Sequence, residues 1–181
     1  MNRITQFVIL DILKNRIVLI YTFLLAILSW SVFSLEDNST KGLLSLLNII
    51  LLIVPLVAVI FSTIYQYNSA EFIELLLSQP VQRKKIWWSL FLGLSASMML
   101  AFSIGAGIPL LIYEPSTVGF MMFGIGNLIS VVFVSLALLS AILTRDKAKG
   151  IGISIMLWLL DRKSTRLNSS HSTLSRMPSS A

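Results

Sequence analysis

Four long apolar runs divide this chain, and short polar or charged stretches separate them. A helix of about 20 residues rises 1.5 Å per residue and so crosses a hydrocarbon core of roughly 30 Å. The runs therefore predict four complete transmembrane helices, at 17–35, 43–65, 86–113 and 117–143. The expected fold class is an all-α integral membrane protein. The links 36–42 and 114–116 are short, so each should join antiparallel neighbours.

A fifth apolar run starts at Gly150 and stops at Leu160, which as a helix covers only about 16 Å. Ending a helix inside hydrocarbon leaves backbone groups unpaired, so the run predicts half of a fifth span. Residues 161–181 hold nine Ser or Thr and the only histidine, His171. We interpret 161–181 as a non-native disordered tail on a fragment. A genuine tail after a short re-entrant segment is the alternative.

Positive charge alternates from one connection to the next. The N-terminal lead and the second and fourth connections carry nine cations, Arg3, Lys14, Arg16, Arg83, Lys84, Lys85, Arg145, Lys147 and Lys149. The only cation in the other two connections is Lys41. Because cytoplasmic loops are enriched in Lys and Arg, this pattern predicts a cytoplasmic N-terminus, with 1–16 as a cytoplasmic or interfacial segment. No small-residue cleavage site follows the first run, so it is expected to stay as a span.

Composition narrows the chemistry. The 181 residues are 56% hydrophobic and 12% charged, with a net charge of +6 and no cysteine. Thiolate chemistry is therefore excluded, and the long apolar runs argue against a nucleic-acid binder. The four spans contain no ionisable acid, base or histidine, and the chain has no P-loop motif. We therefore expect no catalytic residue, no metal site and no bound cofactor.

Two patterns within the spans concern packing. Small residues recur at every fourth position of the third span, which puts them on one ridge that we expect to contact another helix of this or a second subunit: Ser89, Gly93, Ser97, Ala101 and Gly105. Asn48 and Asn127 are the most polar groups at depth and predict interhelical hydrogen bonds, with a role in a substrate path as the alternative. The pairs Met98–Met99 and Met121–Met122 point about 100° apart on a helix, which argues against a thioether site for Cu(I).

One charged stretch interrupts the apolar pattern, "EFIELLLSQPVQRKK" at 71–85. Asn68 or Ser69 can cap a helix, and Asn68 with Glu71 has capping-box spacing. Pro80 ends that helix, and cations follow it. The stretch predicts an amphipathic cytoplasmic helix at about 68–79. It could lie on the lipid surface, or it could dock a cytoplasmic partner.

The same stretch resembles the cytoplasmic loop of ABC-2-type transporter permeases, which carries a Glu, an E-L-L-L-S-x-P core and a basic residue after the second span. The Gly-Thr that many members have there is replaced by Phe72 and Ile73. Segments 31–80 and 143–159 are further similar to the NosY permeases of nitrous oxide reductase maturation. The resemblance covers 1–160.

The resemblance implies a six-helix permease, here truncated, in a bacterial inner membrane. It implies a separate NosF-like ATPase that binds ATP and Mg²⁺, a periplasmic NosD-like protein and a second permease copy as partners, and a role in copper-centre assembly. It assigns the ATPase contact to nine residues, Glu71, Glu74, Leu75, Leu76, Leu77, Ser78, Gln79, Pro80 and Arg83. The 181-residue form is expected not to transport. A lipid, peptide or drug exporter of the family and a non-transport membrane anchor or assembly factor stay open.

Overall fold

The computed structural model describes residues 10–12, 14–35, 39–70, 73–74, 83–144, 148–153, 155–160 and 163. Within these ranges the elements are helices: α2 (Arg16–Leu35), α3 (Ser39–Asn68), α5 (Arg83–Phe102), η1 (Ser103–Gly107), α6 (Ile108–Tyr113) and α7 (Thr117–Leu143). The elements α5, η1 and α6 form one helical rod, Arg83–Tyr113. A shorter apolar helix, Ala148–Leu160, follows α7.

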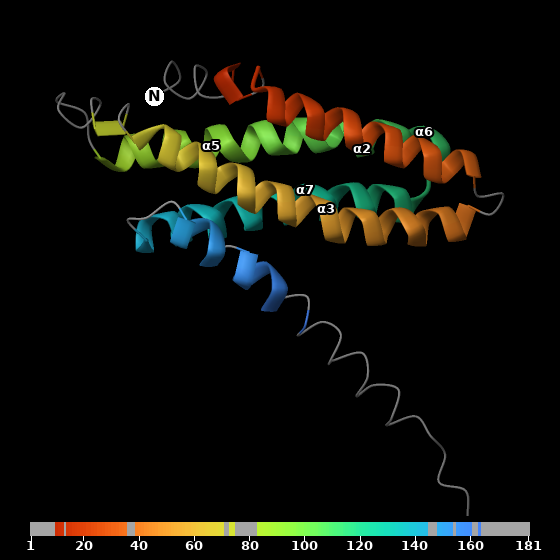
Figure 1. Cartoon of the computed structure of the whole chain (residues 1–181). Coiled ribbons are helices and arrows are strands. Elements are labelled where there is room, and N and C mark those ends of the chain that lie inside the picture. The colour runs from red at the N-terminus through yellow and green to blue at the C-terminus, as the bar shows by residue number, and fades with distance from the viewer. Residues whose placement is uncertain are drawn as a thin grey trace, which may run out of the picture.

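Four rods lie side by side along one long axis (Figure 1). The helix α2 packs against α3 and against η1, α5 and α6, while α7 packs against α3 and α5. The largest of these contacts joins α3 and α7, which run in the same direction. The helices that short links join, α2 with α3 and α6 with α7, run in opposite directions. The bundle therefore closes in the order α2, α3, α7, α5.

Local sequence explains where several helices begin and end. The side chain of Asn15 accepts a hydrogen bond from the backbone N–H of Ile17 at 2.9 Å, which caps the start of α2. Ser116 caps α7 by accepting from the backbone N–H of Gly119 at 3.3 Å. Pro115 separates α6 from α7, because the residue before a proline leaves the helical region. The link 114–116 therefore reverses the chain in three residues.

The rod Arg83–Tyr113 changes its pitch at η1. The N–H of Ile108 bonds to the carbonyl of Ser103, five residues back, so η1 is a π-helical turn. Pro109 follows immediately and has no N–H to bond the carbonyl of Gly105. The wider π-helical turn therefore lies where one α-helical hydrogen bond, to the carbonyl of Gly105, cannot form in any case. Pro55, by contrast, lies inside α3, which continues on both sides of it.

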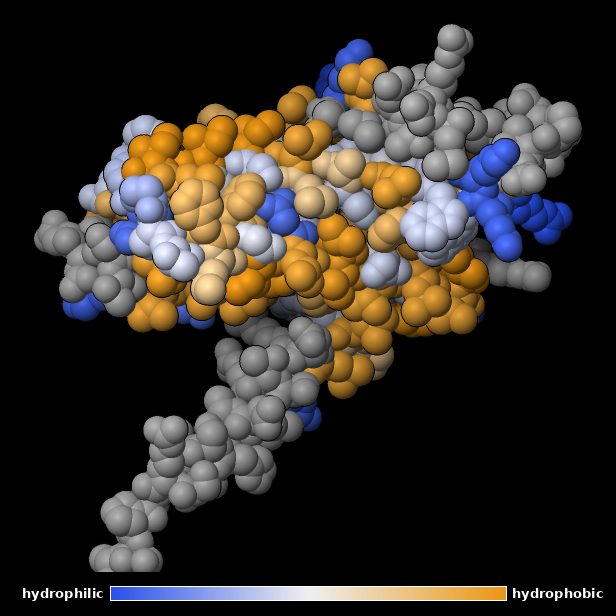
Figure 2. All heavy atoms as spheres, turned by 180° about the vertical axis from the view of Figure 1, so that it is seen from behind, coloured by the Kyte–Doolittle hydropathy of each residue, from blue (hydrophilic) through white to orange (hydrophobic). Residues whose placement is uncertain are grey.

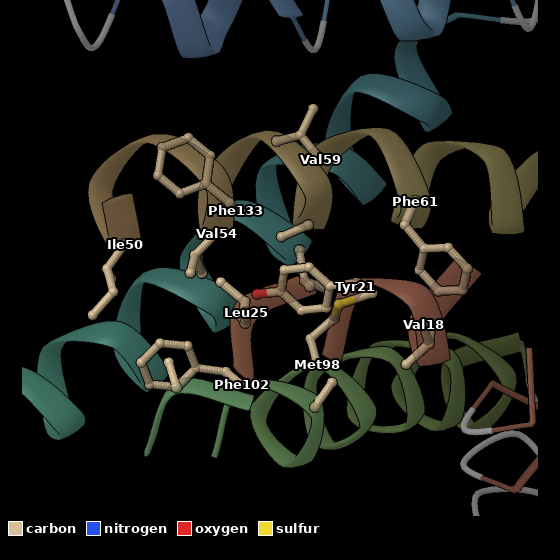
Figure 3. Close-up of a cluster of buried hydrophobic side chains, with 14 of the residues drawn as sticks. Val18, Tyr21, Leu25, Ile50, Val54, Val59, Phe61, Met98, Phe102 and Phe133 are labelled. Atoms are coloured by element: carbon tan, nitrogen blue, oxygen red, sulfur yellow. The ribbon is translucent and has the colours of Figure 1, made fainter. Parts of the chain in front are cut away.

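All four rods contribute to one apolar core (Figure 3). Fully buried side chains include Leu25 of α2, Val54 of α3, Phe102 of α5 and Val134 of α7. Ile12, which precedes α2, is also fully buried, so residues 10–12 pack onto the bundle. Burial of a large apolar side chain contributes about 1.5–3 kcal/mol in water, whereas in lipid close packing carries more of the stability.

The outer surface is apolar between hydrophilic ends, as Figure 2 shows for one face. In the most hydrophobic stretch of α2, only 22% of the residues are buried inside the bundle. Aromatic residues mark both ends of the bundle: Trp87 and Trp88 lie in the second turn of α5, while Trp30 packs edge-on against Tyr113 at 5.7 Å between ring centroids. Trp88 and Tyr113 are 25 positions apart in one rod, or about 37 Å, which fits aromatic belts at two membrane interfaces.

The prediction of four long apolar helices is confirmed, because four described helices are long and apolar enough to cross a membrane. Each is as long as its predicted span or longer, since hydrogen bonding continues into the polar residues at helix ends. The fifth run lies in the helix Ala148–Leu160. Of the interpreted tail, 161–181, only Lys163 falls within the described residues.

Candidate functional site

One end of each of four helices lies at the same end of the bundle, on the left in Figure 1. These are the start of α2, the end of α3, the start of α5 and the end of α7. We call this the basic end, because the cations described there are Lys14, Arg16, Arg83, Lys84, Lys85 and Lys149. The charged residues described at the opposite end are Lys41 and Glu114. The charge alternation along the sequence thus becomes a separation of charge along the bundle axis.

The predicted ATPase-contact segment leaves and rejoins the bundle at this basic end. Of its nine assigned residues, Glu74 and Arg83 lie within the described part of the chain, and both are exposed. Glu71, Leu75, Leu76, Leu77, Ser78, Gln79 and Pro80 lie outside the described residues. The segment therefore departs from the end of α3, and Arg83 marks its return as the first residue of α5.

Helical hydrogen bonding passes from α3 toward the segment with little interruption. The N–H of Ser69 bonds to the carbonyl of Tyr65 at 2.9 Å, and the carbonyl of Ser69 accepts from the N–H of Ile73 at 2.9 Å. The second bond is the one expected when Ser69 precedes a new helix, in which Ala70, Ile73 and Glu74 are helical. Asn68, the other proposed cap, is the last residue of α3. These two bonds connect Ile73 to the end of α3 through Ser69.

Two tyrosines at the end of α3 join it to other parts of the basic end. The hydroxyl of Tyr65 donates to Oδ2 of Asp11 at 3.2 Å, which links residues 10–12 to α3. The hydroxyl of Tyr67 lies 2.7 Å from the carbonyl oxygen of Thr144 and 2.7 Å from its Oγ1. Sequence reasoning missed both contacts. Aromatic residues at a span end are common at membrane interfaces, and nothing in the pattern pairs Tyr67 with a residue 77 positions away.

All five members of the small-residue ridge are buried: Ser89, Gly93, Ser97, Ala101 and Gly105. The neighbour of Gly105 is α2, since a Cβ atom on Gly105 would lie 2.7 Å from the carbonyl oxygen of Thr22 and 2.9 Å from Cβ of Leu25. At this end of the ridge two helix backbones approach each other closely, which a larger residue would prevent.

A cleft of about 500 Å³ lies between the other side of this rod and α7, lined by Ala96, Met99, Leu100, Ser103, Phe123, Gly124 and Asn127. Its lining is apolar except near Ser103 and Asn127. The hydroxyl of Ser103 donates to Oδ1 of Asn127 at 3.3 Å, and Nδ2 of Asn127 donates to the carbonyl of Phe123 at 2.9 Å. Asn127 therefore links α7 to η1. Asn48 is exposed, and its Nδ2 donates to the carbonyl of Leu44 in its own helix at 3.1 Å.

The described residues contain no group of three or more His, Cys, Asp or Glu side chains that could hold a metal ion. The methionine pairs diverge: Met98 and Met122 are buried, whereas their neighbours Met99 and Met121 are exposed. The two thioethers of each pair therefore face opposite environments. Comparison with protein-family models and with curated proteins finds no match for this chain.

Proposed function

We propose that this chain is the transmembrane subunit of an ABC-2-type transporter of the NosY kind. In this proposal a separate ATPase hydrolyses ATP with Mg²⁺, and the segment at about 68–79 receives its motion. The permease acts as a homodimer in a bacterial inner membrane, with a NosD-like periplasmic protein as a further partner in nitrous oxide reductase maturation. In this proposal residues 17–160 belong to the transmembrane region of such a permease.

One observation carries the proposal. The segment that resembles an ABC-2 coupling loop departs from α3 and returns at Arg83, at the same end of the bundle as the described cations of 14–16, 83–85 and Lys149. The positive-inside rule makes that end cytoplasmic, where an ATPase would meet it. If this segment lay at the opposite end of the bundle, its position would argue against the proposal, because a cytoplasmic ATPase would not meet it there.

The proposed coupling is mechanical. Glu74 is exposed and helical, so it is available to a partner, and Arg83 starts the rod that carries the small-residue ridge. Backbone hydrogen bonds connect Ile73 to Ser69 and Ser69 to Tyr65. A push on the segment would therefore move the end of α3 directly, and through Arg83 it would move α5.

Binding to the cognate ATPase tests this role. Glu74→Lys combined with Leu76→Asp reverses the exposed charge and adds a second charge to the apolar run, so we expect roughly tenfold weaker co-purification, the factor that about 1.4 kcal/mol produces. The matched control is Glu114→Lys, the same charge reversal at the opposite end, which should leave binding unchanged. Unchanged binding by the double variant would contradict docking through this segment and would favour a membrane anchor or assembly factor whose loop rests on lipid.

The cleft between α5 and α7 favours a lipid exporter of the same family as a second candidate. Asn127 is the eleventh residue of α7, about 15 Å from its start, so the cleft lies near mid-membrane. An apolar cleft with one amide suits an acyl chain that carries a polar group. Gly124→Trp would fill the cleft and should abolish photocrosslinking of a bifunctional phospholipid to its walls. Gly152→Trp, at an exposed glycine, should not.

A further inference from the structure

The side chain of Tyr67, near the end of α3, contacts two other helical elements at the basic end. Tyr67 is the last residue but one of α3. Its hydroxyl contacts Thr144, the residue that caps the end of α7. A Cβ atom on Gly150 would lie 2.8 Å from Cε2 of Tyr67 and 2.9 Å from Oγ1 of Thr144. Gly150 is buried in the first turn of the helix Ala148–Leu160. Only a glycine leaves room for the ring there.

The hydrogen bonds around Thr144 limit where the tyrosine proton can go. The hydroxyl of Tyr67 is 2.7 Å from the carbonyl oxygen and 2.7 Å from Oγ1 of Thr144, and 3.5 Å from the carbonyl oxygen of Ala141, while Oγ1 of Thr144 is 2.8 Å from the carbonyl of Ser140. Two hydroxyl protons serve these four contacts, since each hydroxyl donates once. If the threonine proton goes to Ser140 or to Tyr67, the tyrosine proton is left for an oxygen of Thr144 or for the carbonyl of Ala141. Each of these assignments joins α3 to the end of α7.

The position of Tyr67 gives this bond a mechanical consequence. Ser69, where the segment at about 68–79 departs from α3, lies two residues after Tyr67, and backbone hydrogen bonds run from Tyr65 through Ser69 to Ile73. The helices α3 and α7 also share the largest helix–helix contact of the bundle. A displacement of the end of α3 at Ser69 therefore acts close to the contact between Tyr67 and Thr144.

We propose that Tyr67 is a latch that transmits displacement of the end of α3 at Ser69 and Ala70 to α7 and to the helix Ala148–Leu160. The latch consists of the Tyr67 ring, both oxygens of Thr144 and the backbone of Gly150. The claim that the latch transmits a displacement caused by an ATPase rests on the proposed function. The claim that the latch is a fixed joint between α3 and α7 does not depend on it. Tyr67 is thus a positioning residue, and its role is to keep three helix ends moving as one unit.

A distance measurement tests the joint without any partner. The chain has no cysteine, so Ala70→Cys with Lys149→Cys places two spin labels at exposed positions on either side of the latch. In nanodiscs we expect one narrow distance distribution, which Tyr67→Phe broadens because it keeps the ring and removes only the hydroxyl. Gly150→Ala should increase the mean distance between the two labels, because the added methyl group would push the ring of Tyr67 away. Tyr113→Phe and Gly152→Ala are the controls, at the opposite end and at a glycine with no atom within 4 Å.

An unchanged distribution in both Tyr67→Phe and Gly150→Ala would overturn the latch. A second measurement separates the latch from the proposed function. With the cognate ATPase bound, Tyr67→Phe should lower permease-dependent stimulation of ATP hydrolysis by roughly fivefold, the factor that one lost hydrogen bond produces in an equilibrium, while leaving co-purification intact. Normal stimulation would overturn transmission. If the unmodified chain binds no ATPase, the proposed function fails and the distance data alone decide the joint.

Discussion

The ring of Phe102 lies directly over the α-carbon of Gly126. A Cβ atom at Gly126 would stand 2.6 Å from Cε1 and 2.9 Å from Cε2 of that ring, and Phe102 is fully buried. The ring cannot move aside without displacing its other neighbours, because protein interiors are close-packed. The contact therefore sets how closely α5 approaches α7, at the level of the hydrogen bond between Ser103 and Asn127.

Gly126→Ala should destabilise the bundle. Forcing one methyl group against a fixed ring costs about 1–3 kcal/mol, which exceeds the gain in helix propensity of about 1 kcal/mol. Gly124→Ala is the matched control, two positions away on the same helix, where no atom lies within 4 Å. Unfolding by SDS in mixed micelles measures both. Equal stability of the two variants would contradict the Phe102 contact.

Gly105→Ala should weaken the contact between η1 and α2. Its new methyl group meets the backbone oxygen of Thr22 at 2.7 Å, and a backbone atom cannot rotate away as a side chain does. We expect a loss of about 1–3 kcal/mol in the same unfolding measurement. Gly152→Ala, at an exposed helical glycine, should lie within about 0.5 kcal/mol of the parent chain. If Gly105→Ala lowers the free energy of unfolding no more than Gly152→Ala does, then α2 does not pack this closely against η1.

The bond between Ser103 and Asn127 should give a measurable coupling energy. A polar contact between helices in a membrane contributes about 0.6 kcal/mol on average and up to about 1.7 kcal/mol. A double-mutant cycle with Ser103→Ala and Asn127→Leu measures it, and we expect a value in that range. Asn48→Leu replaces Asn127→Leu in the control cycle, and its coupling to Ser103→Ala should be zero, because Asn48 bonds within its own helix.

The proposed orientation in the membrane rests on the placement of charge and can be tested with single cysteines, since the chain has none of its own. Lys41→Cys and Glu114→Cys should react with a membrane-impermeant maleimide in intact cells. Arg83→Cys and Lys149→Cys, at the basic end, should react only after the membrane is permeabilised. Labelling of Lys149→Cys in intact cells would reverse the proposed orientation and would place the predicted coupling segment away from any ATPase.

Several helix boundaries could be read almost directly from the sequence. The first span, predicted at 17–35, is Arg16–Leu35, and the fourth is Thr117–Leu143 as predicted. Length and hydropathy suffice here, because a chain in lipid must satisfy its backbone within each span. The capping residues Asn15 and Ser116 act locally, over two or three positions. The π-helical turn before Pro109 was not predicted, although a proline near the end of a span was the available signal.

The helix partners and the individual contacts could not be read in this way. The sequence does not indicate that α3 lies beside α7, that Asn127 faces Ser103 while Asn48 bonds within its own helix, or that Tyr67 meets Thr144 and Gly150. These contacts depend on how far each helix is rotated about its axis. In water an apolar stripe reveals that rotation, whereas a span that is apolar all round carries no such signal.

By itself the sequence determined four helices long and apolar enough to cross a membrane and the end of the bundle that carries the described cations, because both follow from how single residues partition between water and lipid. The tertiary structure decided which small residues meet a backbone and which face a cleft, as Gly126 and Gly124 show from two positions apart. It also decided that one tyrosine ring joins three helix ends at the basic end. Those outcomes are set by shape complementarity between whole helices, which emerges only when the helices pack.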